Sequence, residues 1–239
     1  MPALFISDLH LSEDRPAANE RFFSFLEETA RGVGSLYILG DFFEYWIGDD
    51  DLAYPFHAVI AGILRELSRN GVALYLMHGN RDFLIGTRFC EATGATLLDD
   101  PTVVELEGEK TLLMHGDTLC TDDLDYQAWR RTARSSAWQR EFLGKSLAER
   151  RHAIVGMREK SKEVISAKPA EIMDVNPGAV QEAMKRHGVK RLIHGHTHRP
   201  GRHTVDLGGV RGERWVLPDW YGRGGYLSLS GKSLKLVPF

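Results

Sequence analysis

The chain has few of the residues that mark several large classes of protein. Only two of its 239 residues are cysteine, and Cys90 and Cys120 form no CxxC pair. This excludes a disulfide framework, and we expect both thiols to stay reduced in a cytosolic setting. No apolar run approaches the roughly 18 residues of a membrane-spanning helix. Residues 1–10 lack a basic segment followed by an apolar stretch, so we expect no signal peptide.

A large excess of charge of one sign is also missing. The 30 lysines and arginines nearly balance the 33 aspartates and glutamates, which argues against a generic nucleic-acid coat. The 24 glycines and 9 prolines, together with apolar residues in short bounded runs, exclude collagen-like, disordered and coiled-coil chains. The length fits one globular domain with an insertion, or at most two small domains.

Five short, largely apolar runs predict strands. They cover residues 3–6, 36–39, 73–77, 111–114 and 191–193, and each ends at a segment rich in Gly, Asp, Asn or His. Runs of this kind are typical of strands buried on both faces. We expect these strands to lie side by side, with their polar loops at one edge, because α/β sheets collect ligands there.

Helical patterns separate these strands. Apolar side chains repeat at intervals of three and four residues over 22–30 and 56–67, and each pattern stops before a glycine. An Asn-Pro pair at 176–177 predicts the capped start of a third helix. The alternation of strands with helices indicates an α/β fold. Residues 215–217 and 225–237 alternate like antiparallel strands, and we expect them to complete a second sheet.

Residues 121–170 differ in charge from the rest of the chain. This segment has eleven lysines and arginines against seven aspartates and glutamates, a net charge of +4, whereas the remainder carries −7. Residues 122–143 and 146–165 are predicted to be helical. Two interpretations stay open. The segment is either an amphipathic helical pair with a solvated basic face, or a cap over the strand ends that contacts an anionic, partly apolar substrate.

The polar ends of the predicted strands carry a mixed set of side chains that bind metals. Seven such residues each follow a buried strand: Asp8, His10, Asp41, Asn80, His115, His196 and His198. Seven oxygen and nitrogen donors are too many for one tetrahedral zinc ion. They suit two divalent ions held about 3.5–4 Å apart by a shared carboxylate. The lack of thiolate donors favours Mn²⁺ or Fe²⁺.

The motifs that carry these residues resemble those of the calcineurin-like metallophosphoesterases over nearly the whole chain. The pattern D-x-H, G-D, G-N-[HR]-[DE], H-G-D and G-H-x-H is present without a gap. The resemblance implies two packed mixed β-sheets flanked by helices. It divides the chain into a core of residues 1–120 and 171–239 and an inserted helical cap of residues 121–170.

The same resemblance implies two sets of metal ligands that share one carboxylate. The sets are Asp8, His10, Asp41 and His198 for one ion, and Asp41, Asn80, His115 and His196 for the other. A hydroxide between the metals would attack phosphorus in line, and both metals would stabilise the developing charge.

Arg81 departs from the pattern of many superfamily members, which have histidine there to protonate the leaving group. Arginine stays charged at any working pH, so Arg81 can bind phosphate oxygens but cannot act as a general acid. An enzyme without that acid is expected to prefer a leaving group that is already a weak base. A phosphate expelled from a pyrophosphate meets this need, whereas a simple alkoxide does not. The residues therefore favour cleavage of a phosphoanhydride.

Four longer segments resemble the bacterial UDP-2,3-diacylglucosamine pyrophosphatase family. They span residues 41–50, 78–84, 115–123 and 172–176, and the similarity extends from the first strand to the tail. This family hydrolyses UDP-2,3-diacylglucosamine at the alpha phosphorus, giving UMP and 2,3-diacylglucosamine 1-phosphate (lipid X) in lipid A biosynthesis. It uses Mn²⁺ at the cytoplasmic face of the inner membrane. The resemblance implies two Mn²⁺ ions per chain and peripheral contact with that membrane, with no nucleic acid and no obligate protein partner.

The family also implies which residues contact the substrate. Six residues are assigned in this way: Asn80, Arg81 and His196 beside the phosphate, and Asp123, Ser161 and Lys168 beside the glucosamine phosphate head. A family position that can be Asn falls on Ile165, which offers no polar contact. Apolar side chains of residues 121–170 would line an acyl-chain groove, and their positive charge would face anionic lipid.

Other functions stay open on the residues alone. One is a soluble di-metal phosphodiesterase or nucleotide-sugar pyrophosphatase with a non-lipid substrate. Another is a metal-binding scaffold that organises a partner surface, although all seven ligand positions are filled. A nuclease would need a basic groove with stacking aromatics, and the charge of −7 outside residues 121–170 speaks against it.

Several polar residues near the motifs have simpler interpretations. We expect His78 and His194 to be buried and hydrogen-bonded to backbone. Asp117 either orients a metal ligand or belongs to a plain turn. The acidic residues 49–51 favour a solvated loop, and residues 219–220 are expected to pack near the site.

Overall fold

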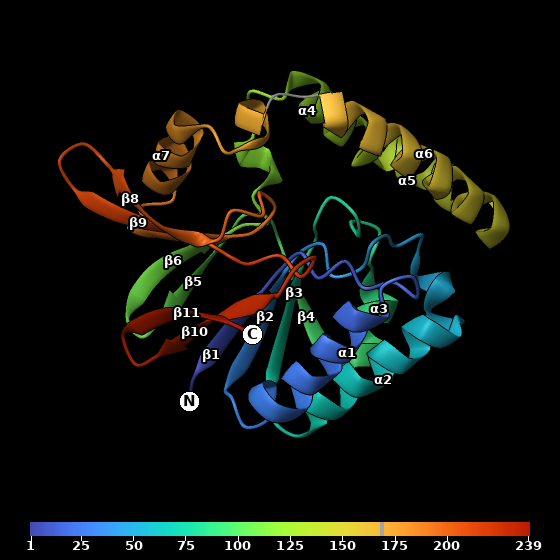
Figure 1. Ribbon diagram of the computed structural model, residues 1–239, viewed down its shortest axis with the longest axis horizontal. Coiled ribbons are helices and arrows are strands. Elements are labelled where there is room, and N and C mark those ends of the chain that lie inside the picture. The colour runs from blue at the N-terminus through green and yellow to red at the C-terminus, as the bar shows by residue number, and fades with distance from the viewer. Residues whose placement is uncertain (168–169) are drawn as a thin grey trace.

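The computed structural model describes residues 1–167 and 170–239, without the side chains of residues 160–171. Its strands form two mixed sheets (Figure 1). The first sheet has the order β11-β10-β1-β2-β3-β4, in which β1 to β4 are parallel. Its strands are β1 (Ala3–Ile6), β2 (Ser35–Leu39), β3 (Ala73–Met77), β4 (Ala95–Leu98), β10 (Gly225–Ser230) and β11 (Ser233–Pro238).

The second sheet has the order β5-β6-β7-β9-β8, with β6, β7 and β9 parallel and the two edge strands antiparallel to their neighbours. Its strands are β5 (Thr102–Leu106), β6 (Glu109–Leu113), β7 (Arg191–His194), β8 (Gly201–Asp206) and β9 (Arg211–Val216). The two mixed sheets confirm the predicted fold class.

Seven α-helices accompany the sheets in the described residues. They are α1 (Pro16–Phe25), α2 (Pro55–Arg69), α3 (Thr87–Thr93), α4 (Leu124–Ala133), α5 (Ser136–Leu143), α6 (Leu147–Ala167) and α7 (Pro177–Arg186). A π-helical turn, Leu26–Ala30, extends α1, so the predicted helix over 22–30 is confirmed. Asn176 caps α7 as its sequence predicts, because its Oδ1 accepts hydrogen bonds from the amides of Gly178 and Ala179.

The alternation of side chains along the inner strands builds the layers. In β1, Leu4 and Ile6 belong to the core on the side of α1 and α2, while Ala3 and Phe5 belong to the core between the sheets. A third core lies between the second sheet and α7 and includes Leu112 of β6. The strands are therefore buried on both faces, in an arrangement of helix, sheet, sheet and helix.

Helices α4–α6, which we call the helical insert, form a separate layer at the top of Figure 1, beyond the loops that follow β1–β3. Phe142 is fully buried against the core beside α1 and α2, and Leu147, Ile154 and Met157 are partly buried there. The expected single helix over 122–143 is broken at Ser135, whose hydroxyl caps α5 by accepting from the amide of Trp138.

One sequence expectation about the sheets is wrong and a second is only partly right. The five predicted strands do not lie side by side in one sheet, because β1–β3 belong to the first sheet and β6 and β7 to the second. The tail strands β10 and β11 extend the first sheet along β1, whereas β9 joins the second sheet. Continuous apolar strands can be covered by a helix layer or by another sheet, so the pattern does not identify the neighbour.

Candidate metal centre

The seven predicted ligands lie together where the carboxyl ends of the two sheets meet. The first sheet supplies Asp8 and His10 after β1, Asp41 after β2 and Asn80 after β3, and the second supplies His115 after β6 and His196 and His198 after β7. The loops of both sheets, rather than one sheet edge, thus build the site.

The donor atoms form two groups. In the first, Asp8, His10 and His198 each place one donor atom within 4.8 Å of the others, and in the second Asp41, His115 and His196 do the same. Asp41 faces both groups, since its Oδ2 lies 3.8 Å from Nε2 of His10 and its Oδ1 lies 3.8 Å from Nε2 of His115. This is the position expected of a bridging carboxylate.

Asn80 adds an amide oxygen to the second group. Its Oδ1 lies 3.0 Å from Nε2 of His115 and 3.0 Å from Nδ1 of His196. The other ring nitrogen of His115 is 2.9 Å from the carbonyl oxygen of Leu39. That contact fixes the tautomer of His115 and directs Nε2 into the site.

The backbone at the centre is strained. Six non-glycine residues of the described chain have a positive φ angle, and five of them are predicted ligands: Asp8 (55°), His10 (51°), Asp41 (51°), His196 (67°) and His198 (54°). A non-glycine residue in a sparsely populated backbone region costs of order 1–3 kcal/mol and persists only where its surroundings hold it there. The loops therefore sacrifice stability to aim these side chains inward.

Two glycines make room for the carboxylates. A Cβ atom on Gly195 would lie 2.2 Å from Oγ of Ser7 and 2.3 Å from Oδ2 of Asp8. A Cβ atom on Gly79 would lie 2.1 Å from Oδ1 of Asp41. Any side chain at these positions would displace a predicted ligand, so the sequence requires glycine there.

Burial and mutual contact shift the pKa values of these side chains. Burial opposes the charge on His115, yet Asp41 and Asp8 raise the pKa of its ring to about 9. Burial and the neighbouring His115 lower the pKa of His196 to about 4. Burial also raises the pKa of Asp41, although His115 and His10 favour its charged form. A divalent ion would take the place of the proton that these carboxylates attract.

The centre fits metal ions on this evidence from its own atoms. Nε2 of His10 is buried and makes no hydrogen bond to any described residue, although Asp41 is nearby. Oδ2 of Asp8 accepts from the hydroxyl of Ser7 at 2.6 Å and from the amide of His196 at 2.8 Å, which orients the carboxylate. Oriented carboxylates and an unpartnered imidazole nitrogen are what a divalent cation requires.

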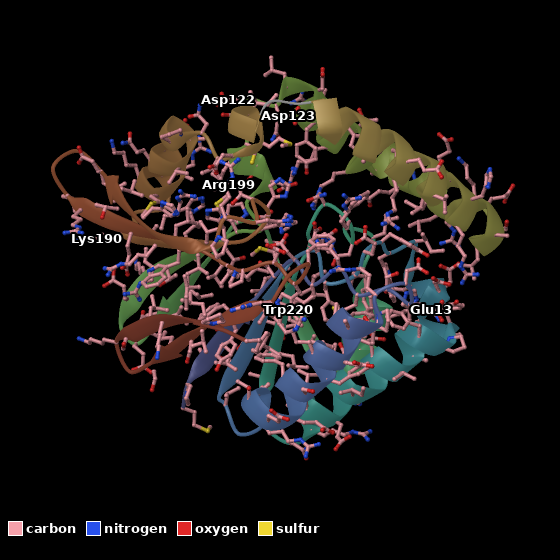
Figure 2. All side chains as sticks on the ribbon, in the orientation of Figure 1. Glu13, Asp122, Asp123, Lys190, Arg199 and Trp220 are labelled. Carbon is pink, nitrogen blue, oxygen red and sulfur yellow. The ribbon has the colours of Figure 1, made fainter. Side chains whose placement is uncertain are left out.

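Of the predicted substrate contacts outside the ligand set, Arg81 lies beside this centre and Asp123 lies at the start of α4. The amide of Arg81 donates to Oδ1 of Asp41 at 2.8 Å, while its side-chain Nε is buried without a hydrogen-bond partner among the described residues. Asp123 caps α4, accepting from the amide of Tyr126, and lies at the upper end of this helix (Figure 2). Lys168 lies outside the described residues, as do the side chains of Ser161 and Ile165.

Asp117 belongs to a turn, as one of its two interpretations predicted, since it begins the 3-10 turn Asp117–Leu119, and it also holds α4 in place. Its Oδ2 accepts from the hydroxyl of Tyr126 and from Nε of Arg130, both at 2.6 Å. It therefore fixes α4 next to the centre, where the Tyr126 ring lies 5.9 Å from that of His196. The sequence did not predict that the partners of Asp117 lie in the next helix, because nothing in the pattern of residues links them.

The expected backbone hydrogen bonds of two histidines are confirmed, and His194 is buried as predicted, whereas His78 is only partly buried. Nε2 of His78 lies 2.7 Å from the carbonyl oxygen of Ile85, and Nδ1 of His194 lies 2.9 Å from that of Gly195. The expected packing of residues 219–220 near the site also holds, since the buried Trp220 donates its amide to the carbonyl of Asp8 (Figure 2).

The prediction of a solvated loop at residues 49–51 is wrong. Asp51 is buried and pairs with Arg151 of α6 and with His57. Asp49 accepts hydrogen bonds from the indole of Trp46 at 3.0 Å and from the amide of Gly86 at 2.9 Å. An acidic run is usually solvated, but here arginines of the helical insert, far along the chain, neutralise it.

Two residues at the centre were not singled out by the sequence. Glu44 is buried, with Oε2 3.3 Å from Nδ1 of His10. The ring of Tyr221 lies 4.8 Å from that of His10 and 5.5 Å from that of His198. Glu44 follows the G-D motif by three residues, so its place in that loop was the available signal. Tyr221 had none.

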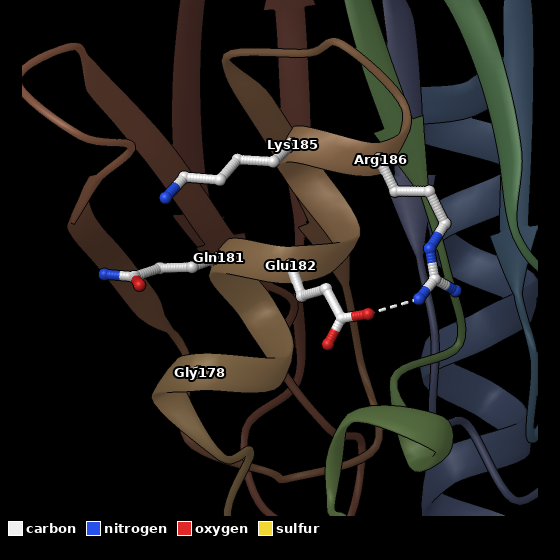
Figure 3. A pocket seen from close by; sticks show the side chains of 5 residues that line it. All are labelled: Gly178, Gln181, Glu182, Lys185 and Arg186. Carbon is white, nitrogen blue, oxygen red and sulfur yellow. Dashed lines mark hydrogen bonds and ion pairs between the residues drawn. The ribbon is translucent and has the colours of Figure 1, made fainter.

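A surface pocket of about 520 Å³ lies elsewhere, along α7 (Figure 3). It is lined by Gly178, Gln181, Glu182, Lys185 and Arg186. Glu182 and Arg186 pair with each other one helical turn apart, as the dashed line in Figure 3 shows. None of these five is a predicted site residue, so the pocket is separate from the metal centre.

Comparison with known proteins gives a consistent result. Residues 1–200 match the family model described as calcineurin-like phosphoesterase. The chain is 50% identical over 238 residues to the UDP-2,3-diacylglucosamine hydrolase of Pseudomonas entomophila, covering 99% of this chain and 98% of that protein. It is 48% identical over 231 residues to the protein of the same name from Aromatoleum aromaticum, covering 97% of this chain and 94% of that protein.

Proposed function

Because the chain belongs to the calcineurin-like phosphoesterases and, within them, to the UDP-2,3-diacylglucosamine hydrolase family, we propose that it hydrolyses UDP-2,3-diacylglucosamine. The products are UMP and 2,3-diacylglucosamine 1-phosphate, an intermediate of lipid A biosynthesis. One observation carries the proposal to the residues: Asp41 lies between the two donor groups, with one carboxylate oxygen 3.8 Å from His10 and the other 3.8 Å from His115. The amide of Arg81 donates to this carboxylate, and its side-chain Nε has no hydrogen-bond partner among the described residues.

Seven side chains hold the metal ions in this proposal. Asp8, His10, Asp41 and His198 bind one Mn²⁺, and Asp41, Asn80, His115 and His196 bind the other. The donor set of carboxylate, amide and imidazole without thiolate supports manganese. When bound, the two ions supply a lowered pKa for the attacking water and neutralisation of charge on the phosphoryl oxygens.

Arg81 binds the pyrophosphate. Its guanidinium carries a permanent charge and offers several donors to phosphate oxygens, and Asn80 and His196 lie on the same side of the centre. Attack at the alpha phosphorus of the UMP half expels the sugar phosphate, which needs no proton from a general acid. The lack of an acid at position 81 therefore suits this bond.

The helical insert binds the acylated sugar. Asp123, Ser161 and Lys168 contact the glucosamine phosphate head, and aromatic side chains receive the acyl chains. Phe83 and Trp138 lie with their ring centres 6.0 Å apart, and Trp138 stacks on Phe142 at 4.8 Å. Phe142 is buried beneath Trp138, so the acyl chains would lie on the partly exposed rings of Trp138 and of Phe83, two residues after Arg81.

The enzyme meets its lipid substrate at the surface of the inner membrane. No helix of the described residues is long and apolar enough to cross a membrane. Four exposed apolar side chains of the insert favour peripheral contact: Leu124, Trp129, Leu143 and Val155. The net charge of +4 on residues 121–170 favours an anionic surface.

The proposal is tested with the purified protein after chelation and addition of Mn²⁺. UDP-2,3-diacylglucosamine is assayed beside UDP-N-acetylglucosamine and bis-p-nitrophenyl phosphate, in ¹⁸O water with product masses measured. We expect metal-dependent release of ¹⁸O-labelled UMP from the acylated substrate alone. Equal turnover of the compounds without acyl chains would instead indicate a general phosphodiesterase or nucleotide-sugar pyrophosphatase, and label in the sugar phosphate would overturn attack at the alpha phosphorus.

A further inference from the structure

Glu44 is a buried carboxylate that contacts a predicted metal ligand from behind. Only 4% of its surface is exposed. Its Oε2 lies 3.3 Å from Nδ1 of His10, on the opposite side of the ring from Nε2, which faces Asp41. The two atoms are within ion-pair distance, although Nδ1 makes no hydrogen bond to the described residues. A carboxylate beside Nδ1 favours the tautomer with the proton on that nitrogen, which leaves the lone pair of Nε2 for a metal.

The other oxygen of Glu44 leads to the helical insert. Oε1 pairs with the guanidinium of Arg158 on α6, and that guanidinium lies over the ring of Tyr45, 5.7 Å from its centre. The hydroxyl of Tyr221 donates to Oε2 at 3.3 Å. Arg158 is thus the cationic partner that compensates the buried charge of Glu44.

We propose that Glu44 is a positioning residue for His10 and that Arg158 couples the docking of α6 to the affinity of the first donor group for its ion. The inference rests on the two-ion centre of the proposed function. The contact joins the segment that builds the centre to a helix more than a hundred residues later in the chain. A shift of α6, for example when lipid binds beside it, would then change the position of His10 through Arg158 and Glu44.

A second arginine of α6 provides the matched control. Arg151 pairs with the buried Asp51, seven residues after Glu44, and lies over Tyr54 with 4.8 Å to the ring centre. Asp51 contacts His57, which is not a predicted ligand. Arg151 and Arg158 therefore make similar ion pairs to the same stretch of chain, but only Arg158 leads to the metal centre.

The test is a Mn²⁺ titration of chelated protein, with free Mn²⁺ followed by electron paramagnetic resonance. In wild type we expect two ions per chain. Glu44→Ala is expected to lower the affinity for one of the two ions by roughly 10–100-fold, the usual effect of losing a carboxylate that contacts a metal-binding histidine. The second ion is expected to change much less. Glu44→Gln should fall between wild type and Glu44→Ala, because it keeps an oxygen beside Nδ1 of His10 but loses the negative charge.

The arginine variants test the coupling. Arg158→Gln is expected to lower the affinity for the same ion by roughly 3–10-fold, less than loss of the carboxylate itself. Arg151→Gln is expected to keep the wild-type affinity. The double variant Glu44→Ala/Arg158→Gln should be no weaker than Glu44→Ala, since contacts in one network are not additive. Circular dichroism checks that each variant is folded.

The outcomes separate this inference from the function it rests on. A wild-type protein that binds no Mn²⁺ would overturn both. Two ions in wild type with unchanged affinities in folded Glu44→Ala would overturn the positioning role alone. Equal losses in Arg158→Gln and Arg151→Gln would overturn the coupling, because they would show only a general effect of undocking α6.

Discussion

The metal centre and the helical insert are held in place by different forces. At the centre, backbone strain and close contacts with glycine fix the ligands, as at Asp8 and Gly195. The insert packs Phe142 against the core and is otherwise attached by long side chains, among them Arg130 to Asp117, Arg134 to the carbonyl of Gly79, and Arg158 to Glu44. The predicted ligands thus lie on tightly packed loops that tolerate no added side-chain atom, while the proposed substrate-binding helices are attached by contacts that other side chains could make.

At the metal centre, the largest loss of activity is expected when Asp41 loses its charge. Asp41→Asn keeps an oxygen for the amide of Arg81 but loses the charge that both ions would share. We expect kcat/KM for UDP-2,3-diacylglucosamine to fall by roughly 10³-fold or more, because metal catalysis supplies several kcal/mol of charge stabilisation. The measurement is steady-state kinetics with Mn²⁺. The exposed Glu105→Gln is the control, and a loss below tenfold would contradict a bridging role.

A glycine-to-alanine substitution is expected to have different consequences at the metal centre and in the helical insert. Gly195→Ala is expected to displace Asp8 and to lower kcat by roughly 100-fold, the scale of a 1 Å misplacement. Gly156→Ala on α6 meets no atom within 4 Å and is expected to leave kcat unchanged while stabilising the helix by about 0.5–1 kcal/mol. Kinetics and chemical denaturation of the pair measure both effects. Similar activity in the two variants would show that the loop at Gly195 can accommodate a methyl group without displacing Asp8.

The attachment of the insert is the third point of comparison. The side chain of Arg150 is buried and bonds the carbonyls of Ile47 and Lys145 as well as Asp50. Arg150→Gln is expected to lower the free energy of unfolding by about 1–3 kcal/mol, because buried acceptors lose their partner. The exposed Arg186→Gln on α7 is expected to cost about 0.2–0.5 kcal/mol. Urea unfolding distinguishes them, and equal losses would refute a special anchor.

The smallest expected effect concerns substrate choice. Trp129 is 45% exposed, with its ring 5.8 Å from that of Trp138. Trp129→Gln is expected to lower kcat/KM for the diacylated substrate by roughly 5–10-fold through lost apolar contact, with no change for bis-p-nitrophenyl phosphate. Val59→Ser, an exposed apolar residue on α2, is the control. An equal loss on both substrates would place Trp129 in the chemistry instead of in acyl binding.

The sequence predicted which polar residues come together better than it predicted the arrangement of the sheets. Each ligand follows a strand and carries a distinctive side chain, so position and chemistry agree, as at Asp41 and His115. The partner of a strand depends on contacts far along the chain, and an apolar run such as that of β6 fits either sheet. For the same reason the acidic run at 49–51 was misjudged, since its partners Arg150 and Arg151 lie about a hundred residues later.

Local signals succeeded where one short segment contains the whole cause. Asn176 and Pro177 predicted the start of α7 because the cap acts on the next three residues. The positive φ angles of the ligands had no such signal. A positive φ is uncommon for any residue other than glycine, and no glycine stands at these positions to indicate it.

Each donor group takes side chains from both sheets. The first joins Asp8 and His10 to His198, and the second joins Asp41 to His115 and His196. An ion in either group is therefore a cross-link between two layers that otherwise adhere through apolar contacts. Between Asp8 and His198 this clasp closes a loop containing most of the chain, the case in which a metal clip restricts the unfolded chain most. The ions would thus stabilise the packing of the two sheets as well as take part in catalysis.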